Sequence, residues 1–152
     1  MVQRLLGLGD NTVDTYVDRG LQFPGGNAVN VAVQARRLGA ETGYLGCLGS
    51  DEAGGILSDA LRQEGVDTAR CRIKTGPNAR AFIGHDGQDR RFLRSERGVR
   101  GEWGTFDAED RAYIAGFDLV HSSIYGELGD ALPVVRSAAR RLSYDFSERW
   151  TD

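Results

Sequence analysis

The spacing of apolar positions changes along the chain between the period of a strand and the period of a helix. Arg4–Gly9 and Glu41–Leu48 are short apolar runs, and we expect both to be buried strands. Between these runs, apolar residues recur every three or four positions from Asn27, and Gly39 follows as a typical C-terminal helix residue. The apolar stripe of this helix comprises Val29, Ala32, Val33, Ala35 and Leu38.

A second helix is predicted to begin at Asp51 or Glu52 and to stop at Gly65. Strand, helix, strand and helix in this order predict a parallel α/β unit. The same alternation returns later in the chain. There we expect helices over Phe106–Ala115, with Asp107 as the N-cap, and Leu132–Arg141, and strands over Asp118–Ser122 and Leu142–Phe146.

A different pattern occupies two other segments. Val13–Val17 alternates like an exposed strand, and Leu21–Gly26, with Pro24, is expected to be a loop. Later, Asp86-Gly87 predicts a hairpin turn. Short alternating strands are expected around it, at Cys71–Lys74, Ala79–His85 and Arg90–Arg94. They predict a small antiparallel sheet inserted in the α/β body.

Length and composition fit one soluble globular domain and exclude several classes. The chain has 152 residues, of which 40% are hydrophobic and 27% charged, so disorder is not expected. No apolar run reaches the ~20 residues of a membrane helix, and a net charge of −3 argues against a nucleic-acid partner. Two cysteines and two histidines without metal-ligand spacing predict no metal site and no disulfide framework, and we expect a cytoplasmic setting.

Two groups of residues could form a ligand site. Asp10, Asn11 and Asp14 follow the first strand, where parallel sheets bind ligands. A carboxylate can accept hydrogen bonds from two neighbouring sugar hydroxyls, and an asparagine can both donate and accept. The alternative is ordinary turn chemistry. The glycines of Gly25-Gly26 precede a helix whose first turn presents Asn27 and Asn30 on one face. Two interpretations are open: these residues line a ligand site, or they form a simple loop-to-helix turn.

The motifs GGNAVNVAVQARRLG, YLGCLGSDEAGG and LRQEGVD resemble the N-terminal signature of the ribokinase-like (PfkB) carbohydrate kinases. The resemblance implies a three-layer α/β/α sheet with a small antiparallel β lid over residues 13–23 and 71–94. It makes residues 1–152 the N-terminal part of such a domain, with the C-terminal half absent. The segments GDNTVD, DLVHSSIYGELGDALP and YDFSERW resemble more narrowly the kinases of fructoselysine.

The resemblance also implies roles for individual residues. Asp14 matches the sugar-binding aspartate, and Gly25, Gly26 and Asn30 match the motif that lines the sugar pocket. By the same analogy, further pocket positions are Asp10, Asn27, Tyr125 and Asp145. A fructosamine carries an amino group, which Asp10 or Glu127 could pair with.

The resemblance implies ATP and Mg²⁺ in the complete enzyme and a small sugar substrate, without nucleic acid or membrane. The family places its general base in a late Gly-Ala-Gly-Asp motif, which the 152 residues do not contain. We therefore expect the base beyond residue 152 and no activity of this chain alone. Gly126–Asp130 is interpreted as a helix cap. The alternatives are a sugar- or nucleoside-binding module without catalysis and a truncated inactive fragment. A homodimer through the lid is a further family expectation.

Two remaining features have ordinary explanations beside functional ones. The basic run Arg90–Arg100 is either a solvated hairpin edge or a phosphate-binding patch. His121, at the end of a core strand, either lines the pocket or is a satisfied core histidine.

Overall fold

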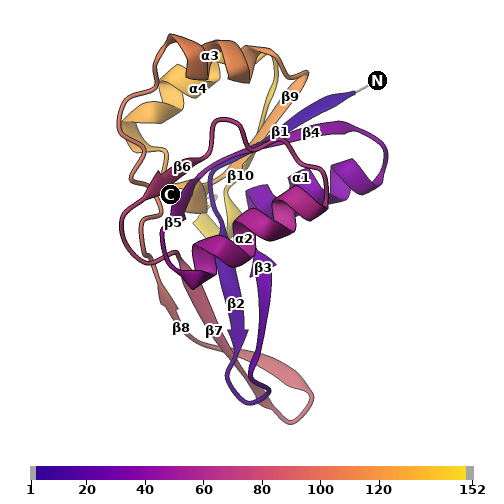
Figure 1. The fold of residues 1–152 in the computed structure, drawn as a ribbon, viewed down its shortest axis with the longest axis vertical. Coiled ribbons are helices and arrows are strands. Elements are labelled where there is room, and N and C mark those ends of the chain that lie inside the picture. The colour runs from indigo at the N-terminus through magenta and orange to yellow at the C-terminus, as the bar shows by residue number, and fades with distance from the viewer. Residues whose placement is uncertain (1–2, 150–152) are drawn as a thin grey trace.

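The computed structural model describes residues 3–149, and a four-stranded parallel sheet forms its centre (Figure 1). The strands are β1 (Arg4–Leu8), β4 (Glu41–Leu45), β9 (Leu119–Ser123) and β10 (Leu142–Asp145), in the order β10-β9-β1-β4. Their carboxyl ends therefore meet at one edge of the sheet, as the alternating pattern predicts.

Helices cover both faces of this sheet, which gives three layers. The helices α1 (Asn27–Arg37) and α2 (Glu52–Gln63) share one apolar cluster with Tyr44 of β4. The helices α3 (Ala108–Ala115) and α4 (Leu132–Ala138) share a second cluster with the next residue, Leu45. Successive strand residues point to opposite faces, so β4 supplies both cores. The predicted α/β fold class is confirmed.

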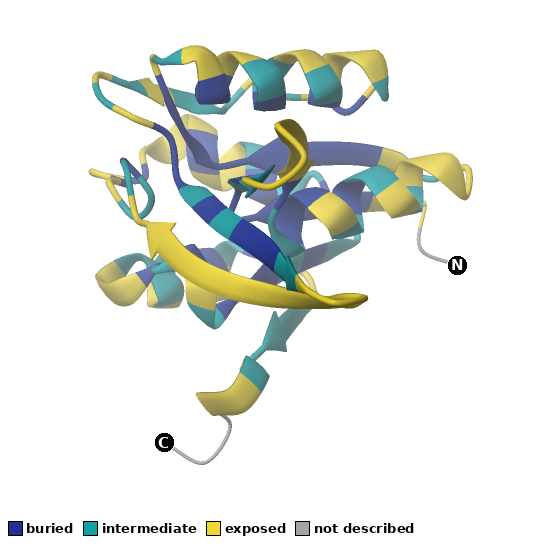
Figure 2. Cartoon of the chain, turned by 90° about the horizontal axis from the view of Figure 1, so that it is seen from below, coloured by how far each residue is buried: buried dark blue, intermediate teal, exposed yellow. Residues whose placement is uncertain are grey.

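A second sheet extends from the first and contains β3 (Leu21–Gly25), β2 (Thr12–Tyr16), β7 (Arg80–Asp86) and β8 (Asp89–Glu96), in that order. The outer pairs β2–β3 and β7–β8 are antiparallel, and of these the β7–β8 hairpin was expected. The central pair β2–β7 is parallel, so the sheet is mixed rather than wholly antiparallel. It projects below the helical layers in Figure 1, and Figure 2 shows β8 exposed along its length.

Three sequence predictions about strands are wrong. Leu21–Gly25 is a strand and not a loop, because it pairs with β2. The run Glu41–Leu48 is divided at Gly46, and its second part becomes β5 (Cys47–Gly49). β5 pairs in parallel with β6 (Arg72–Lys74), so β6 belongs to a separate two-stranded sheet and not to the second sheet.

The helix boundaries are close to the predicted ones. Asp107 is the N-cap of α3, as expected, and α3 begins at Ala108. Short 3₁₀ turns cover Ile124–Gly126, Gly129–Ala131 and Ser147–Arg149. The interpretation of Gly126–Asp130 as a helix cap is wrong, because the N-cap of α4 is Ala131, which lies outside this segment. Within residues 3–149, no helix is long and apolar enough to span a membrane.

Candidate functional site

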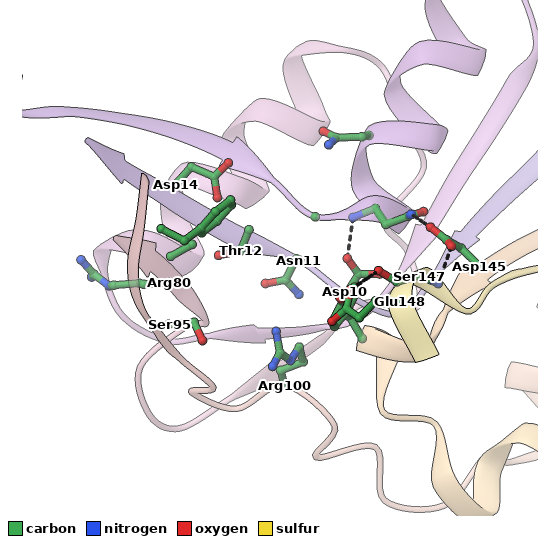
Figure 3. A pocket seen from close by; sticks show the side chains of 16 residues that line it. Asp10, Asn11, Thr12, Asp14, Arg80, Ser95, Arg100, Asp145, Ser147 and Glu148 are labelled. Atoms are coloured by element: carbon green, nitrogen blue, oxygen red, sulfur yellow. Dashed lines mark hydrogen bonds between the residues drawn. The ribbon is translucent and has the colours of Figure 1, made fainter. Parts of the chain in front are cut away.

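A cavity of about 770 Å³ lies where the carboxyl ends of β1 and β10 and the first turn of α1 face the second sheet (Figure 3). Asp14 and Arg80 lie on one side of the view, and Asp145 and Glu148 lie on the other. The lining residues are Asp10, Asn11, Thr12, Asp14, Gly26, Asn27, Asn30, Arg80, Ala81, Phe92, Ser95, Arg100, Tyr125, Asp145, Ser147 and Glu148. Of the eight candidate residues, only Gly25 lies outside this lining.

Asp14 is the carboxylate on the second-sheet side of the cavity. It lies in the middle of β2, and burial raises its pKa, while the nearby Arg90 guanidinium acts in the opposite direction. No hydrogen bond to its carboxylate is formed by the residues that the structure describes. The two oxygens are therefore available to accept hydrogen bonds from a ligand.

The two glycines before α1 have different tasks. Gly26 is the N-cap at a φ of 106°, and a Cβ there would lie 2.6 Å from the Asn11 Cα atom, so a larger residue does not fit. A Cβ at Gly25 would lie 3.0 Å from the Asp14 Oδ2 atom. Gly25 thus leaves room for the Asp14 carboxylate without lining the cavity itself.

Asp10 caps α1 from the end of β1. Its Oδ2 atom accepts a hydrogen bond from the Asn27 amide, and its Oδ1 atom accepts from the Ala28 amide at 3.3 Å and the Ser123 hydroxyl at 2.7 Å. Gly26 offers no side chain to this helix, so Asp10 supplies the missing acceptor. Asp10 is only 5% exposed, and both of its carboxylate oxygens are used in these hydrogen bonds.

The opposite wall is built from β10 and the turn that follows it. The Asp145 carboxylate accepts hydrogen bonds from the Asn27 side-chain amide at 2.6 Å and from the Ser147 backbone amide at 2.8 Å. The Tyr125 hydroxyl lies 3.0 Å from the Ser147 hydroxyl and donates to Glu148 at 2.8 Å. Hydrogen bonds from the Ser147 hydroxyl, at 2.7 Å, and from the Tyr125 hydroxyl lower the pKa of Glu148 and favour its charged form.

Nine lining residues are not among the eight candidates; of these, Asn11 belongs to the turn expected to hold a ligand, and Arg80 and Arg100 are positively charged. Asn11 is buried and holds the turn together through bonds to Tyr44 and Asn78. Arg80 and Arg100 bring positive charge to the cavity, although Arg80 donates to Asp51 and Arg100 to Glu127, both at 3.0 Å. The sequence carries no signal for Arg80, because its position depends on the pairing of β7 with β2.

The two carboxylates expected to pair with an amino group are otherwise engaged. Glu127 does not line the cavity, and its oxygens accept from Arg97 at 2.6 Å and Arg100 at 3.0 Å. Asp10 lines the cavity, but both of its oxygens already accept hydrogen bonds. Neither residue is well placed for that interaction.

The cavity does not offer a phosphate cradle for ATP. The amides at the start of α1 are the natural anion-binding groups, and Asp10 already occupies those of Asn27 and Ala28. Among residues 3–149, no group of three or more His, Cys, Asp or Glu side chains is arranged to hold a metal ion. The first amides of α1 are already bound to a carboxylate within the chain.

Neither histidine lines the cavity. His85 lies in the second sheet, with its Nδ1 atom 2.6 Å from the Asp18 carboxylate and its ring stacked on Tyr16. His121 lies on β9, where its ring nitrogens contact Asn27 and Ser143. It is therefore a partnered histidine directly behind the wall.

Comparison with known proteins gives consistent matches over nearly the whole chain. A family model for pfkB family carbohydrate kinases matches residues 3–141. Fructosamine kinase FrlD of Bacillus subtilis is 40% identical, covering 98% of this chain and 53% of the relative. Fructoselysine 6-kinase of Escherichia coli is 36% identical, covering 98% of this chain and 57% of the relative.

Solved structures match the fold. Arabidopsis thaliana ribokinase complexed with ribose and ATP superposes with a TM-score of 0.82 at 20% identity, covering 97% of this chain and 54% of that one. Fructokinase with bound ATP from Xylella fastidiosa gives 0.75 at 25% identity, covering 99% and 50%. The chain spans about half the length of the curated relatives it matches.

Proposed function

Because this chain belongs to the PfkB family of carbohydrate kinases, we propose that its cavity binds the sugar substrate of an ATP-dependent kinase. The observation that carries the proposal is the Asp14 carboxylate, which faces the cavity without a hydrogen-bond donor among the described residues. A half-buried carboxylate without a partner costs folding energy, and two sugar hydroxyls would satisfy it.

Asn30, Asn27 and Gly26 complete the sugar side of the site. Asn30 is exposed on the first turn of α1 and can both donate and accept hydrogen bonds. Gly26 lets the backbone approach the ligand closely. Together with Asp14, these groups match a small polyhydroxylated molecule in size and chemistry.

We propose a fructosamine such as fructoselysine as the substrate class, since both curated relatives named above act on this class by their names. The amine of a fructosamine is protonated near neutral pH and needs an anionic partner. We propose Glu148 for this role in place of Asp10 and Glu127. It lines the cavity, and hydrogen bonds from Tyr125 and Ser147 favour its charged form.

We propose that this chain contributes sugar binding and orientation, and that the general base, ATP and Mg²⁺ are held by residues outside it. The 152 residues contain no Gly-Ala-Gly-Asp run. The α1 amides, which could bind a phosphate, are occupied by Asp10. No step of phosphoryl transfer is assigned to a residue of this chain.

We also propose that the second sheet joins a second copy of the chain. Residues in register on neighbouring strands share a face, so Leu21 and Phe23 lie on the face that carries Asp14. Both residues are about half exposed to solvent: Leu21 is 47% exposed and Phe23 is 49% exposed. A second copy seated on this face would cover them.

Titration calorimetry on the chain and its Asp14→Asn variant tests the sugar-binding proposal. Fructoselysine is expected to bind more tightly than fructose. Asp14→Asn is expected to weaken binding at least about tenfold, because a hydrogen bond to a charged group contributes roughly 1.5–3 kcal/mol and about 1.4 kcal/mol is tenfold. Asp86→Asn, an exposed change in the same sheet, is the matched control and should bind like the wild type.

Equal affinities for the wild type and Asp14→Asn would overturn the assignment of Asp14. The Glu148→Gln variant tests the substrate class separately. It should bind fructose unchanged and lose most of the preference for fructoselysine. An unchanged preference would remove Glu148 as the partner of the amine.

A further inference from the structure

His121 contacts one pocket residue at close range although it does not line the cavity. Its Nε2 atom lies 2.6 Å from the Asn27 Oδ1 atom, and its Nδ1 atom lies 3.1 Å from the Ser143 hydroxyl. The three residues come from β9, α1 and β10, which are far apart in the sequence. The contact therefore joins three elements behind one wall of the cavity.

The charge of Asp145 determines how this chain of hydrogen bonds is oriented. A carboxylate only accepts hydrogen bonds, so the Asn27 side chain must turn its NH₂ group to Asp145, at 2.6 Å. The amide oxygen of Asn27 then faces His121, and the Nε2 atom must carry a proton. Burial lowers the pKa of His121, although Asp145 and Asp10 oppose this, so the ring is neutral and Nδ1 accepts from Ser143.

Asn27 therefore connects two carboxylates of the cavity. Its backbone amide binds Asp10, and its side-chain amide binds Asp145. A free Asn27 side chain could rotate or reverse its amide and leave Asp145 without this donor. The imidazole of His121 opposes both changes, because Nε2–H bonds to the amide oxygen in the observed orientation and loses that acceptor when the amide turns.

We propose that His121 is a positioning residue of the candidate site: its Nε2–H fixes the Asn27 amide, which holds the Asp145 carboxylate at the cavity wall. His121 does not touch the ligand and acts through Asn27. The effect on affinity rests on the proposed sugar binding. The hydrogen-bond arrangement itself does not, and the two are tested separately.

The arrangement is tested first by ¹⁵N NMR of the imidazole rings in the ligand-free chain. The chain has only two histidines, so assignment with a His85→Gln variant is direct. Near pH 7, His121 is expected as a neutral ring with its proton on Nε2. Asn27→Ala should remove this preference. A proton on Nδ1, or a tautomer indifferent to Asn27, would overturn the proposal whatever the chain binds.

The effect on the site is tested by fructoselysine affinity in two variants. His121→Leu removes the donor and should weaken binding about tenfold, the effect of one hydrogen bond. His121→Gln offers an amide N–H in place of Nε2–H and should restore affinity to within about threefold of the wild type. His85→Leu, the same change in the second sheet, is the matched control and should bind normally.

The outcomes separate the two proposals. Wild-type affinity in a folded His121→Leu variant would contradict the positioning role. Equal losses in His121→Gln and His121→Leu would also contradict it, because a donor at that position would then not matter. If the wild-type chain binds no sugar, the proposed function fails, and the NMR experiment still decides whether His121 fixes Asn27.

Discussion

Asp14, the residue proposed to bind the sugar, opposes the stability of its own fold. Its carboxylate lies in the middle of a strand, half-buried, and burial raises its pKa. A carboxyl group whose pKa is higher in the folded than in the unfolded chain binds protons more readily when folded. Stability is therefore greatest below the unfolded pKa and falls as the pH rises through the folded pKa.

Asp14→Asn is accordingly expected to be more stable than the wild type at pH 7, since it removes the desolvated charge. Urea unfolding at pH 7 and at pH 3 measures this difference. The advantage of the variant should be larger at pH 7, where Asp14 is ionised in the wild type. A variant less stable than the wild type at pH 7 would mean that an unrecognised partner satisfies Asp14.

At the residue scale, the sequence predicted the sites that follow strand ends. Asp10 could be anticipated, because the carboxyl ends of parallel strands meet at one edge, whereas Asp145 followed only from the family resemblance. Arg80 and Arg100 could not, because their positions depend on which strands pair and how the loop after β8 returns. The sequence pattern also could not predict what each carboxylate does. That Asp10 caps α1 depends on the three-dimensional approach of β1 to the start of the helix.

At the scale of elements, a buried acid joins α3 to the strand β6. Asp110 is 2% exposed, forms a capping box with Asp107, and accepts from Arg70 and Arg72, each at 2.7 Å. Arg72 also stacks on Phe106. Asp110 thus accepts hydrogen bonds at the start of α3 and also pairs with the guanidinium groups of two arginines.

Asp110→Ala is expected to destabilise the chain by about 3–5 kcal/mol, the range for removing one partner of a buried ion pair. Glu109→Ala is the matched control, because Glu109 also bonds to Arg70 but its side chain is 82% exposed. Its effect should be close to zero. Thermal unfolding of both variants makes the comparison. Similar losses would show that burial of Asp110 is not what matters.

The pattern of apolar residues predicted elements well and pairing poorly. The helix from Asn27 was clear because its stripe repeats over three turns. Leu21–Gly25 was missed because Pro24 and Gly25 are rare in strands, and this strand lies at a sheet edge, where proline is tolerated. The division at Gly46 was missed because both parts are buried and apolar.

At the scale of the whole molecule, the second sheet leaves apolar side chains in solvent. Val17, Leu21 and Phe23 are 47–50% exposed, and Phe92 is 68% exposed. A sheet with long exposed edges is prone to further association unless a partner covers it. The proposed homodimer through this sheet would provide that cover.

Sedimentation velocity tests the proposed dimer. The wild-type chain is expected to sediment as a dimer, and Leu21→Glu as a monomer, because the new charge would have to be buried. Leu38→Glu changes an equally apolar but remote residue that is 88% exposed, and it should remain dimeric. A monomeric wild type, or a dimeric Leu21→Glu variant, would contradict this interface.

The most direct test of the central claim is a ¹H–¹⁵N NMR titration of the 152-residue chain with fructoselysine. The amides of Asp14, Gly26 and Asn30 should shift in a saturable manner, and those of Leu38 and Gly39, at the far end of α1, should not. Shifts confined to other parts of the chain, or none with the sugar in large excess over the protein, would contradict a sugar site in this cavity.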